Sequence, residues 1–249
     1  MAIDLSSTIT GDIMKITYIN HSGFLVETRD CYYIFDYFKG ELPYLDKKKE
    51  VIIFCSHFHE DHFNPDIFTL ADSHPHTVYV LSDDIWQNRV PEKHFSRTHF
   101  IDPGRMIHLA EGGGILIHTF RSTDEGVAFL VEAGGKTIFH AGDLNDWQWN
   151  GESLSWNHTM KANYQKELET IHRLGIIPDA AMVPLDGRQE DLFYLGLHEF
   201  MCQVGAGMVF PMHFWNDFSV IDRLKSLKCS DSYRDKIAEI QTEGQSFEI

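Results

Sequence analysis

Residues 57–62, His-Phe-His-Glu-Asp-His, constrain this chain more than any other stretch. They follow the apolar run Val51–Cys55, and Pro65 comes shortly after them. This order predicts a buried strand, a short loop and the first turn of a helix. The loop therefore carries imidazole and carboxylate groups at the end of a rigid strand, where ligands are commonly positioned. Such donors suit zinc, manganese or iron(II) better than calcium or magnesium.

The motif His57-x-His59-x-Asp61-His62 resembles the signature of the metallo-β-lactamase superfamily. Later segments match the same family in chain order, over about residues 13–215: they are 19–26 with Ile34-Phe35-Asp36, His140-Ala141-Gly142-Asp143, and Pro211-Met212-His213-Phe214. The opening is similar to that of the ascorbate-6-phosphate lactonase-like branch of metal-dependent hydrolases. The resemblance implies a four-layer αββα sandwich of the α/β class, with two mixed β-sheets flanked by helices.

Length and composition favour one domain. The 249 residues, 43% of them apolar or aromatic, supply one sizeable core. We find no internal repeat, low-complexity segment or linker that would divide the chain. We therefore expect a single metallo-β-lactamase-like domain over residues 1–249.

The pattern of apolar residues and turn signals gives a coarse secondary structure. Residues 1–11 are expected to be a loosely held lead-in. An antiparallel meander is predicted from strands at 13–19, 24–28 and 32–35. Further strands are predicted at 77–81, 105–109, 115–120, 127–131, 137–140, 180–183 and 208–211, and helices at 83–90, 160–174, 190–204 and 217–227.

Charge and cysteine content limit the classes of partner. The 21 basic and 37 acidic residues give a net charge of −16, which repels nucleic acid and anionic membranes. No leader peptide or apolar run long enough to span a bilayer is recognised. The four cysteines lie far apart and form no Cys-x-x-Cys pair, so we expect reduced, mostly buried thiols in a cytoplasmic protein.

The family resemblance implies a role for each candidate ligand. His57 and His59 would hold a first metal, Asp61, His62 and His213 a second, and Asp143 would bridge the two. One or two divalent transition metals per chain follow, zinc or manganese first and iron as a further option. The metals would generate a hydroxide nucleophile near neutral pH, and Asp61 would also orient the attacking water.

The chain departs from the family at one position, where the family usually offers a histidine about twenty residues before the Gly-Asp motif. Residues 121–126 are Arg-Ser-Thr-Asp-Glu-Gly here, and His118 falls a few residues early within a predicted strand. Asp124 is the preferred replacement ligand, because a carboxylate coordinates the same metals. The alternative is a turn residue before the strand at Val127. The departure also leaves a mononuclear enzyme open.

Three further features have two interpretations each. His21 either contacts the substrate or a ligand beside the metals, or makes a local turn contact. Arg188 either binds a phosphate or carboxylate with two hydrogen bonds, or forms a surface ion pair. The tryptophans in the stretch 144–157 either line a pocket or pack beneath the following helix.

These features together predict a metal-dependent hydrolase that cleaves an ester, lactone or phosphodiester bond in a small molecule. The alternatives are a nuclease or phosphodiesterase of the same fold, disfavoured by the acidic charge, and a non-catalytic metal-binding protein. A diiron oxidoreductase is disfavoured, because that branch has Glu at the place of His59. We expect a small-molecule substrate, no nucleic acid and no membrane, and leave a homo-oligomer open.

Overall fold

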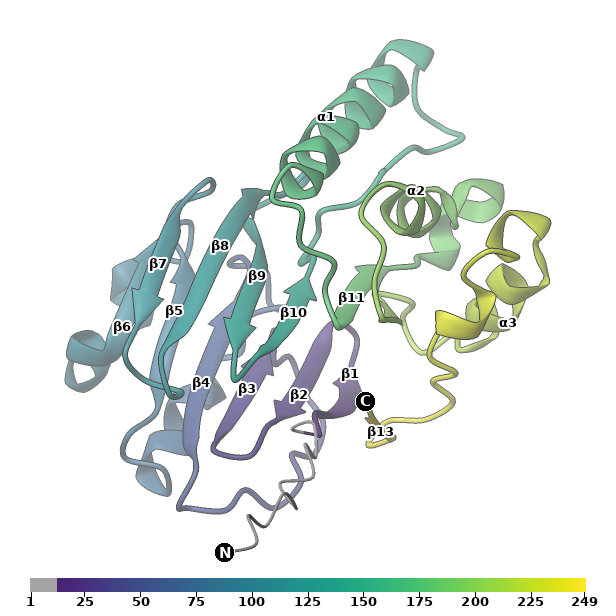
Figure 1. Ribbon diagram of the computed structural model, residues 1–249. Coiled ribbons are helices and arrows are strands. Elements are labelled where there is room, and N and C mark those ends of the chain that lie inside the picture. Colours follow the sequence, from purple (N-terminus) through teal and green to yellow (C-terminus); the bar gives the residue numbers. More distant parts are fainter. Residues whose placement is uncertain (1–12) are drawn as a thin grey trace, which may run out of the picture.

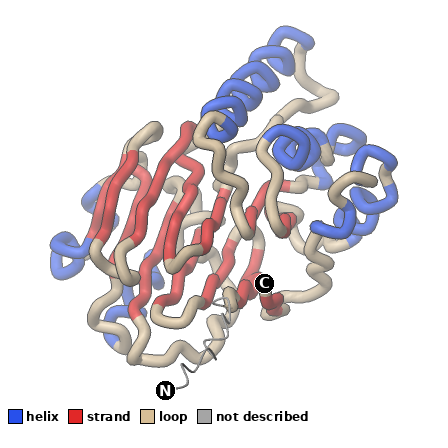
Figure 2. The backbone as a smooth tube through the Cα atoms, in the orientation of Figure 1, coloured by secondary structure: helices blue, strands red, loops and turns tan. Residues whose placement is uncertain are grey.

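The computed structural model describes residues 13–249, so the predicted lead-in at 1–11 lies outside the described part of the chain. Two β-sheets stack face to face, and helices pack on the outer side of each (Figure 1). In Figure 2 the strands form one block, and the longer helices gather at one side of it. This is the αββα sandwich that the family resemblance implies.

The first sheet joins an antiparallel part to a parallel part. Within residues 13–249 its strands, in spatial order, are β13 (Ser246–Glu248), β1 (Lys15–Asn20), β2 (Gly23–Glu27), β3 (Cys31–Phe35), β4 (Glu50–Cys55), β5 (Val78–Ser82) and β6 (Thr98–Ile101). β1, β2 and β3 pair antiparallel, which confirms the predicted meander. β4, β5 and β6 then add in parallel.

The second sheet is mixed in the same way. Its strands, in spatial order and within the same described range, are β12 (Met208–Met212), β11 (Ala180–Pro184), β10 (Lys136–His140), β9 (Val127–Ala133), β8 (Ile115–Arg121) and β7 (Met106–Leu109). β10, β11 and β12 are parallel, and β7 to β10 are antiparallel. Three of these parallel strands, β4, β10 and β12, end in loops that carry candidate ligands.

β4 shows why the chain forms layers. Ile52 and Phe54 lie in the core between the two sheets, whereas Ile53 and Cys55 belong to a second apolar cluster on the opposite face. That second cluster includes Ile67 and Phe68 from the 3₁₀ helix Pro65–Asp72. Both faces of β4 are buried, which explains its uninterrupted apolar sequence. The strand therefore holds the loop after Cys55 firmly.

Three α-helices lie on the side of the second sheet (Figure 1): α1 (Leu154–His172), α2 (Leu195–Gln203) and α3 (Ser219–Ser226). α1 packs against α2 and β8, and α2 packs against β11. Short 3₁₀ helices complete the described chain, at Pro65–Asp72, Gln87–Arg89, Glu92–Arg97, Gly187–Leu192, Lys228–Ser230 and Arg234–Lys236.

Helix boundaries differ from the sequence prediction for local reasons. α1 begins at Leu154 rather than 160, because the Ser153 side chain caps it, although Leu154 itself is exposed. The helix predicted at 190–204 is divided: Glu190, within the 3₁₀ segment Gly187–Leu192, has a φ of +57° that is not helical, and α2 starts only at Leu195. The helix predicted at 83–90 is only the 3₁₀ turn Gln87–Arg89.

The thiols are less buried than predicted. All four cysteines are free; Cys31 and Cys55 are buried, Cys229 is half-buried, and Cys202 is exposed on α2. The expectation of mostly buried thiols is therefore wrong for Cys202. Among residues 13–249, no helix combines the length and apolarity required to cross a membrane.

Candidate metal centre

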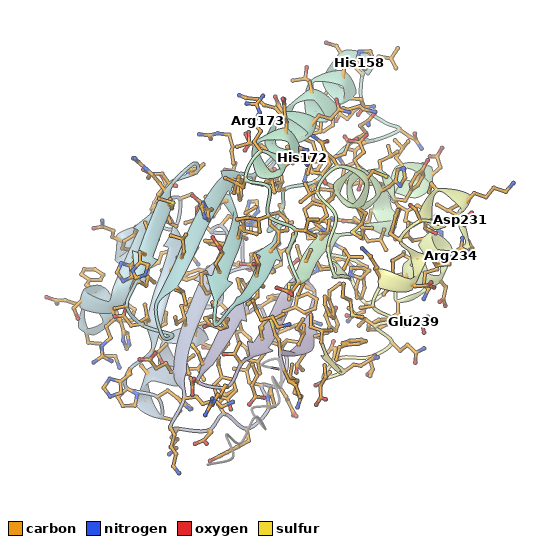
Figure 3. All side chains as sticks on the ribbon, viewed as in Figure 1. His158, His172, Arg173, Asp231, Arg234 and Glu239 are labelled. Carbon is orange, nitrogen blue, oxygen red and sulfur yellow. The ribbon has the colours of Figure 1, made fainter. Side chains whose placement is uncertain are left out.

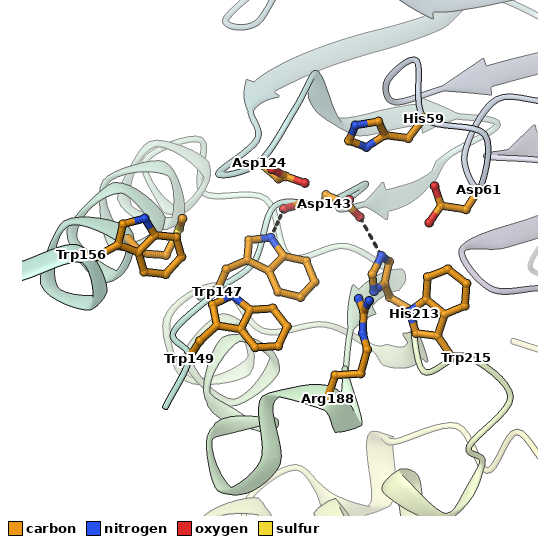
Figure 4. Close-up of a pocket in the computed structure, with 11 residues that line it drawn as sticks. His59, Asp61, Asp124, Asp143, Trp147, Trp149, Trp156, Arg188, His213 and Trp215 are labelled. Atoms are coloured by element: carbon orange, nitrogen blue, oxygen red, sulfur yellow. Dashed lines mark hydrogen bonds and ion pairs between the residues drawn. The ribbon is translucent and has the colours of Figure 1, made fainter. Parts of the chain in front are cut away.

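The candidate ligands share one position in the fold, since each lies on a loop or turn that directly follows a strand. His21 is in the turn after β1; His57, His59, Asp61 and His62 follow β4; Asp143 follows β10; and His213 follows β12. Figure 4 shows several of these side chains converging on one space. The sandwich thus brings donors together from four separate segments of the chain.

A glycine allows two of these loops to touch. Gly142 has a φ of +52°, and a β-carbon there would lie 2.6 Å from the β-carbon of Ser56 and 2.9 Å from the carbonyl oxygen of Val127. Only glycine tolerates both this backbone conformation and this close approach. Asp143 is consequently held directly against the loop that follows β4.

The donors fall into two groups. The four-donor cluster consists of His21, Asp61, His62 and His213, and the three-donor cluster consists of His57, His59 and Asp143. In each cluster the potential ligand atoms, one per residue, all lie within 4.8 Å of one another. The structure therefore brings together six of the predicted ligands and adds His21, for which the sequence suggested a different role.

Asp143 connects the two clusters. Its Oδ1 lies 3.2 Å from Nε2 of His62 and 3.4 Å from Nε2 of His213, both in the four-donor cluster. Its Oδ2 lies 3.5 Å from Nε2 of His57 in the three-donor cluster. One carboxylate oxygen thus faces each cluster, as a bridging ligand requires.

Unpaired buried atoms test whether a metal fits here. Nε2 of His57, Nε2 of His62, Oδ1 of Asp143 and both ring nitrogens of His21 are buried without a hydrogen-bond partner among the described residues. Buried polar atoms are rarely left unpaired, because each such atom costs free energy. Nε2 of His57, Nε2 of His62 and Oδ1 of Asp143 face the clusters, so their chemistry fits divalent transition metals.

A buried carboxylate and a buried hydroxyl orient two of the histidines. Asp36 accepts hydrogen bonds from Nδ1 of His62 at 2.7 Å and from the backbone N–H and hydroxyl of Ser56 at 2.7 and 2.6 Å. The Ser56 hydroxyl also lies 2.9 Å from Nδ1 of His57. Each of these contacts leaves Nε2 of the histidine directed at the clusters, the arrangement found behind metal-bound histidines.

Asp186 has the same role at the other side of the centre. It is fully buried, and it accepts a hydrogen bond from Nδ1 of His213 at 2.9 Å. Its carboxylate also accepts from Nε and Nη2 of Arg188. Burial would raise the pKa of Asp186, but His213 and Arg188 lower it to about 2, so the group stays ionised.

The surroundings shift the pKa values of the histidines in this centre in different directions. Burial lowers the pKa of His21 and of His57 to about 4, so both rings are neutral at pH 7 and keep a free lone pair. Burial would raise the pKa of Asp143, but His62 and His213 hold it well below its usual range. Burial would lower the pKa of His62, but Asp143 and Asp36 raise it well above the usual value. Positive charge is therefore stabilised between His62 and Asp143.

Asp124 lies beside the three-donor cluster without belonging to it. Its side chain is exposed and lines the same pocket as His59 and Asp143. Partial desolvation of its carboxyl group and the charge of Asp143 raise its pKa. Its backbone N–H also donates to the Ser122 hydroxyl, a turn contact. Both interpretations of Asp124 remain compatible with this position.

A cavity of about 320 Å³ opens over the clusters (Figure 4). Its lining includes Arg188 and tryptophans from the stretch 144–157, so those tryptophans face the pocket.

Two other histidines, His140 and His118, have partners outside the two clusters. His140 is buried with Nε2 on the carbonyl oxygen of Ser22, and His118, on β8, contacts Glu132.

The sequence alone did not indicate the roles of Asp36, Ser56 and Asp186. The available signal was position, because Asp36 directly follows β3 and Asp186 lies two positions after the last residue of β11. Such strand-end carboxylates lie at the same edge as the ligands. Nothing in the sequence indicated which histidine each one would contact.

Comparison with known proteins places the chain in a family. A model described as a beta-lactamase superfamily domain matches residues 15–213. A metal-dependent hydrolase from Opitutus terrae is 29% identical over 155 residues, covering 52% of this chain and 63% of that protein, less than two thirds of its length. One from Alkaliphilus metalliredigens is 26% identical over 227 residues, covering 84% of this chain and 88% of that protein.

The fold agrees with that kinship. A metallo hydrolase from the archaeon Ignicoccus hospitalis has a similar structure, with a TM-score of 0.67 at 19% identity, over 95% of this chain and 98% of that one. At such identity the likeness supports the fold alone. The matched residues 15–213 include every candidate ligand from His21 to His213. The chain belongs to the beta-lactamase superfamily domain family.

Proposed function

We propose that this protein hydrolyses an ester, lactone or phosphodiester bond in a small molecule, using water activated at a metal centre. It is a metal-dependent hydrolase, the description that its relatives carry. The observation that supports the proposal most is the pair of donor clusters that Asp143 connects and that open into one pocket. The small cavity and the net charge of −16 favour a small substrate over nucleic acid.

The proposed ligand assignment follows the two clusters. His57, His59 and Asp143 hold the first metal, with Asp124 as a further candidate donor. His21, Asp61, His62 and His213 hold the second, with Asp143 between the two sites. Zinc and manganese fit these imidazole and carboxylate donors best, and iron is a further option. The free thiols suit the reducing cytoplasm, where we expect the protein to act.

The residues of the centre have different roles in the proposed reaction. When bound, the metals polarise the scissile bond and lower the pKa of a coordinated water. Asp36 and Asp186 keep His62 and His213 in place. Asp61 lines the pocket and lies 3.3 Å from Nε2 of His21, so its carboxylate is placed to orient the attacking water.

The test combines metal analysis with a panel of chromogenic esters, lactones and phosphodiesters. In protein made with supplemented zinc or manganese, His213→Ala should lower turnover by more than about 100-fold, since even partners behind the ligands cost 10–100-fold. His172→Ala is the control, because His172 lies exposed at the end of α1 (Figure 3). Unchanged turnover in His213→Ala, or in protein stripped of metal, would contradict the proposal. Metal binding without any turnover would instead favour a non-catalytic metal-binding protein.

A further inference from the structure

We propose that the pocket selects a small substrate with a planar, aromatic group and an oxyanion group, carboxylate or phosphate, that pairs with Arg188. This inference rests on the proposed function, because it names the substrate class of the same pocket. It combines two walls of the cavity, one of tryptophan and one that carries the arginine.

The first wall is flat and apolar. Trp147 and Trp149, on the loop after β10, are nearly parallel, with ring planes 4° apart and centroids 6.0 Å apart. Trp156 and Met160, from the first turns of α1, extend the same side of the pocket. The indole N–H of Trp147 donates to the carbonyl oxygen of Asp143 at 2.8 Å, which fixes this ring against the metal centre. Rigid aromatic surfaces of this kind bind planar rings.

The polar groups behind this wall are already paired. Asn145 donates to Gln189, and Gln189 donates in turn to the carbonyl oxygens of Asp146 and Gln148. Asn150 is bound to Glu190 and Asp191. These amides are therefore not available to bind the hydroxyl groups of a sugar-like ring. Such hydroxyl groups would lose their hydrogen bonds to water on binding and gain none from these amides, which costs free energy. An aromatic ring carries no such cost.

Arg188 is held in place beside this wall. Its Nε and Nη2 donate to the buried Asp186, and its guanidinium lies 5.1 Å from the centroid of the Trp215 ring. No described residue accepts a hydrogen bond from Nη1, and the side chain is 53% exposed. Because Asp186 fixes one edge of the guanidinium, the remaining edge is ready to bind an oxyanion with two hydrogen bonds.

The charge in the pocket favours an anion over a cation. Among the described residues that line it, Arg188 is the one lysine or arginine, and the carboxylates present are Asp61, Asp124 and Asp143. Two of these carboxylates belong to the metal clusters, where bound metals offset their charge. Tryptophan faces also attract organic cations, but Arg188 would repel a cation in this small space. An organic cation is therefore the competing outcome in the test.

The experiment measures binding to metal-loaded protein, with metal content determined and without turnover. The probes are phenylphosphonate, neutral benzamide, glucose 6-phosphate and phenyltrimethylammonium, followed by calorimetry or by quenching of tryptophan fluorescence. We expect phenylphosphonate to bind at least about tenfold more tightly than each of the others, because only it engages both walls.

Matched variants assign the effect to each wall. Arg188→Ala should weaken phenylphosphonate about 10- to 100-fold and leave benzamide unchanged. The control is Arg223→Ala, since Arg223 also stacks on an aromatic ring, Phe193, outside this pocket. Trp149→Ala should weaken the binding of phenylphosphonate and of benzamide about tenfold. The exposed Trp86, which does not line this pocket, provides the control Trp86→Ala.

Several results would overturn the inference. Equal weakening of benzamide and phenylphosphonate by Arg188→Ala would show that Arg188 acts only through Asp186. If Arg188→Ala loses metal, Arg188→Lys replaces it in the test. This variant keeps the positive charge but lacks the planar guanidinium, so it should still reduce the preference for phenylphosphonate. Tighter binding of glucose 6-phosphate or phenyltrimethylammonium would also contradict it. Failure to load metal would contradict the proposed function, whereas failure of phenylphosphonate to bind loaded protein contradicts this inference alone.

Discussion

The two donor clusters differ in how firmly their histidines are held. In the four-donor cluster, the rings of His62 and His213 each donate through Nδ1 to a buried carboxylate, Asp36 or Asp186. In the three-donor cluster, the ring of His57 has only the neutral hydroxyl of Ser56 as its partner, and His59 is partly exposed in the pocket. The four-donor cluster is therefore the more rigid of the two.

This difference in how firmly the histidines are held explains how one centre can bind metal tightly and still admit substrate. A carboxylate behind a histidine fixes its ring and raises its basicity, which strengthens metal binding. The four-donor cluster should accordingly anchor its metal. The three-donor cluster, with fewer donors and an open side at Asp124, should bind its metal more weakly and leave positions for water or substrate.

The largest effect is expected at the residue that the clusters share. Asp143→Ala removes one oxygen from each cluster, so it should reduce metal binding at both sites and lower turnover by more than about 100-fold. Metal analysis and activity measurements on the variant check this. Loss of one metal only would show that Asp143 is not a bridge.

The partners behind the histidines give the next largest effect. Asp186→Asn should weaken the four-donor site about 10- to 100-fold, because His213 loses its charged acceptor. Ser56→Ala should weaken the three-donor site only a few-fold, about the effect of losing one neutral hydrogen bond. Metal titrations of the two variants compare the sites directly. Equal effects would remove the proposed difference between the clusters.

The pH dependence should also differ between the sites. The pKa of His62 is raised, so below that pKa its ring is protonated and a metal must displace the proton. The metal affinity of the four-donor site should therefore fall up to about tenfold for each pH unit as the pH is lowered. The pKa of His57 is lowered to about 4, so its ring stays neutral well below pH 6 and adds no such dependence. Titrations between pH 8 and about pH 6 measure both slopes. The reverse order of slopes would contradict this assignment.

The smallest effect concerns Asp124. If its carboxylate is a donor, Asp124→Ala should lower affinity at the three-donor site and leave the four-donor site intact. Asp124→His should restore binding and shift preference towards zinc, because imidazole is the softer ligand. If it is a turn residue, Asp124→Asn should be nearly silent, and Asp124→Ala should lower the stability of the fold a little without any loss of bound metal. Identical metal affinities in all four proteins would exclude Asp124 as a ligand.

The fold and most donors were predictable because their signals are local. The apolar run of β4 leads directly into His57–His62, and both Asp143 and His213 follow strands. The partner contacts were not predictable. Asp36 and His62 are 26 residues apart, and Asp186 and His213 are 27 apart, so their pairing depends on how strands align in three dimensions.

His21 illustrates the same limit. Its turn was recognised, but its contact with Asp61 depends on how the turn after β1 meets the loop after β4. The start of α1 was missed for another reason, since Leu154 is 80% exposed and gives no helical pattern of buried residues. Tertiary packing decides the His21 contact, whereas the local cap at Ser153 decides where α1 begins.

Metal titration of stripped protein tests the central claim most directly. The account predicts two sites of unequal affinity in the wild-type protein. His213→Ala should weaken the tighter site and His59→Ala the weaker one, each with the other site largely retained. One site only, two equal sites, or the same loss in both variants would contradict a centre built from a firmly held cluster and an open one.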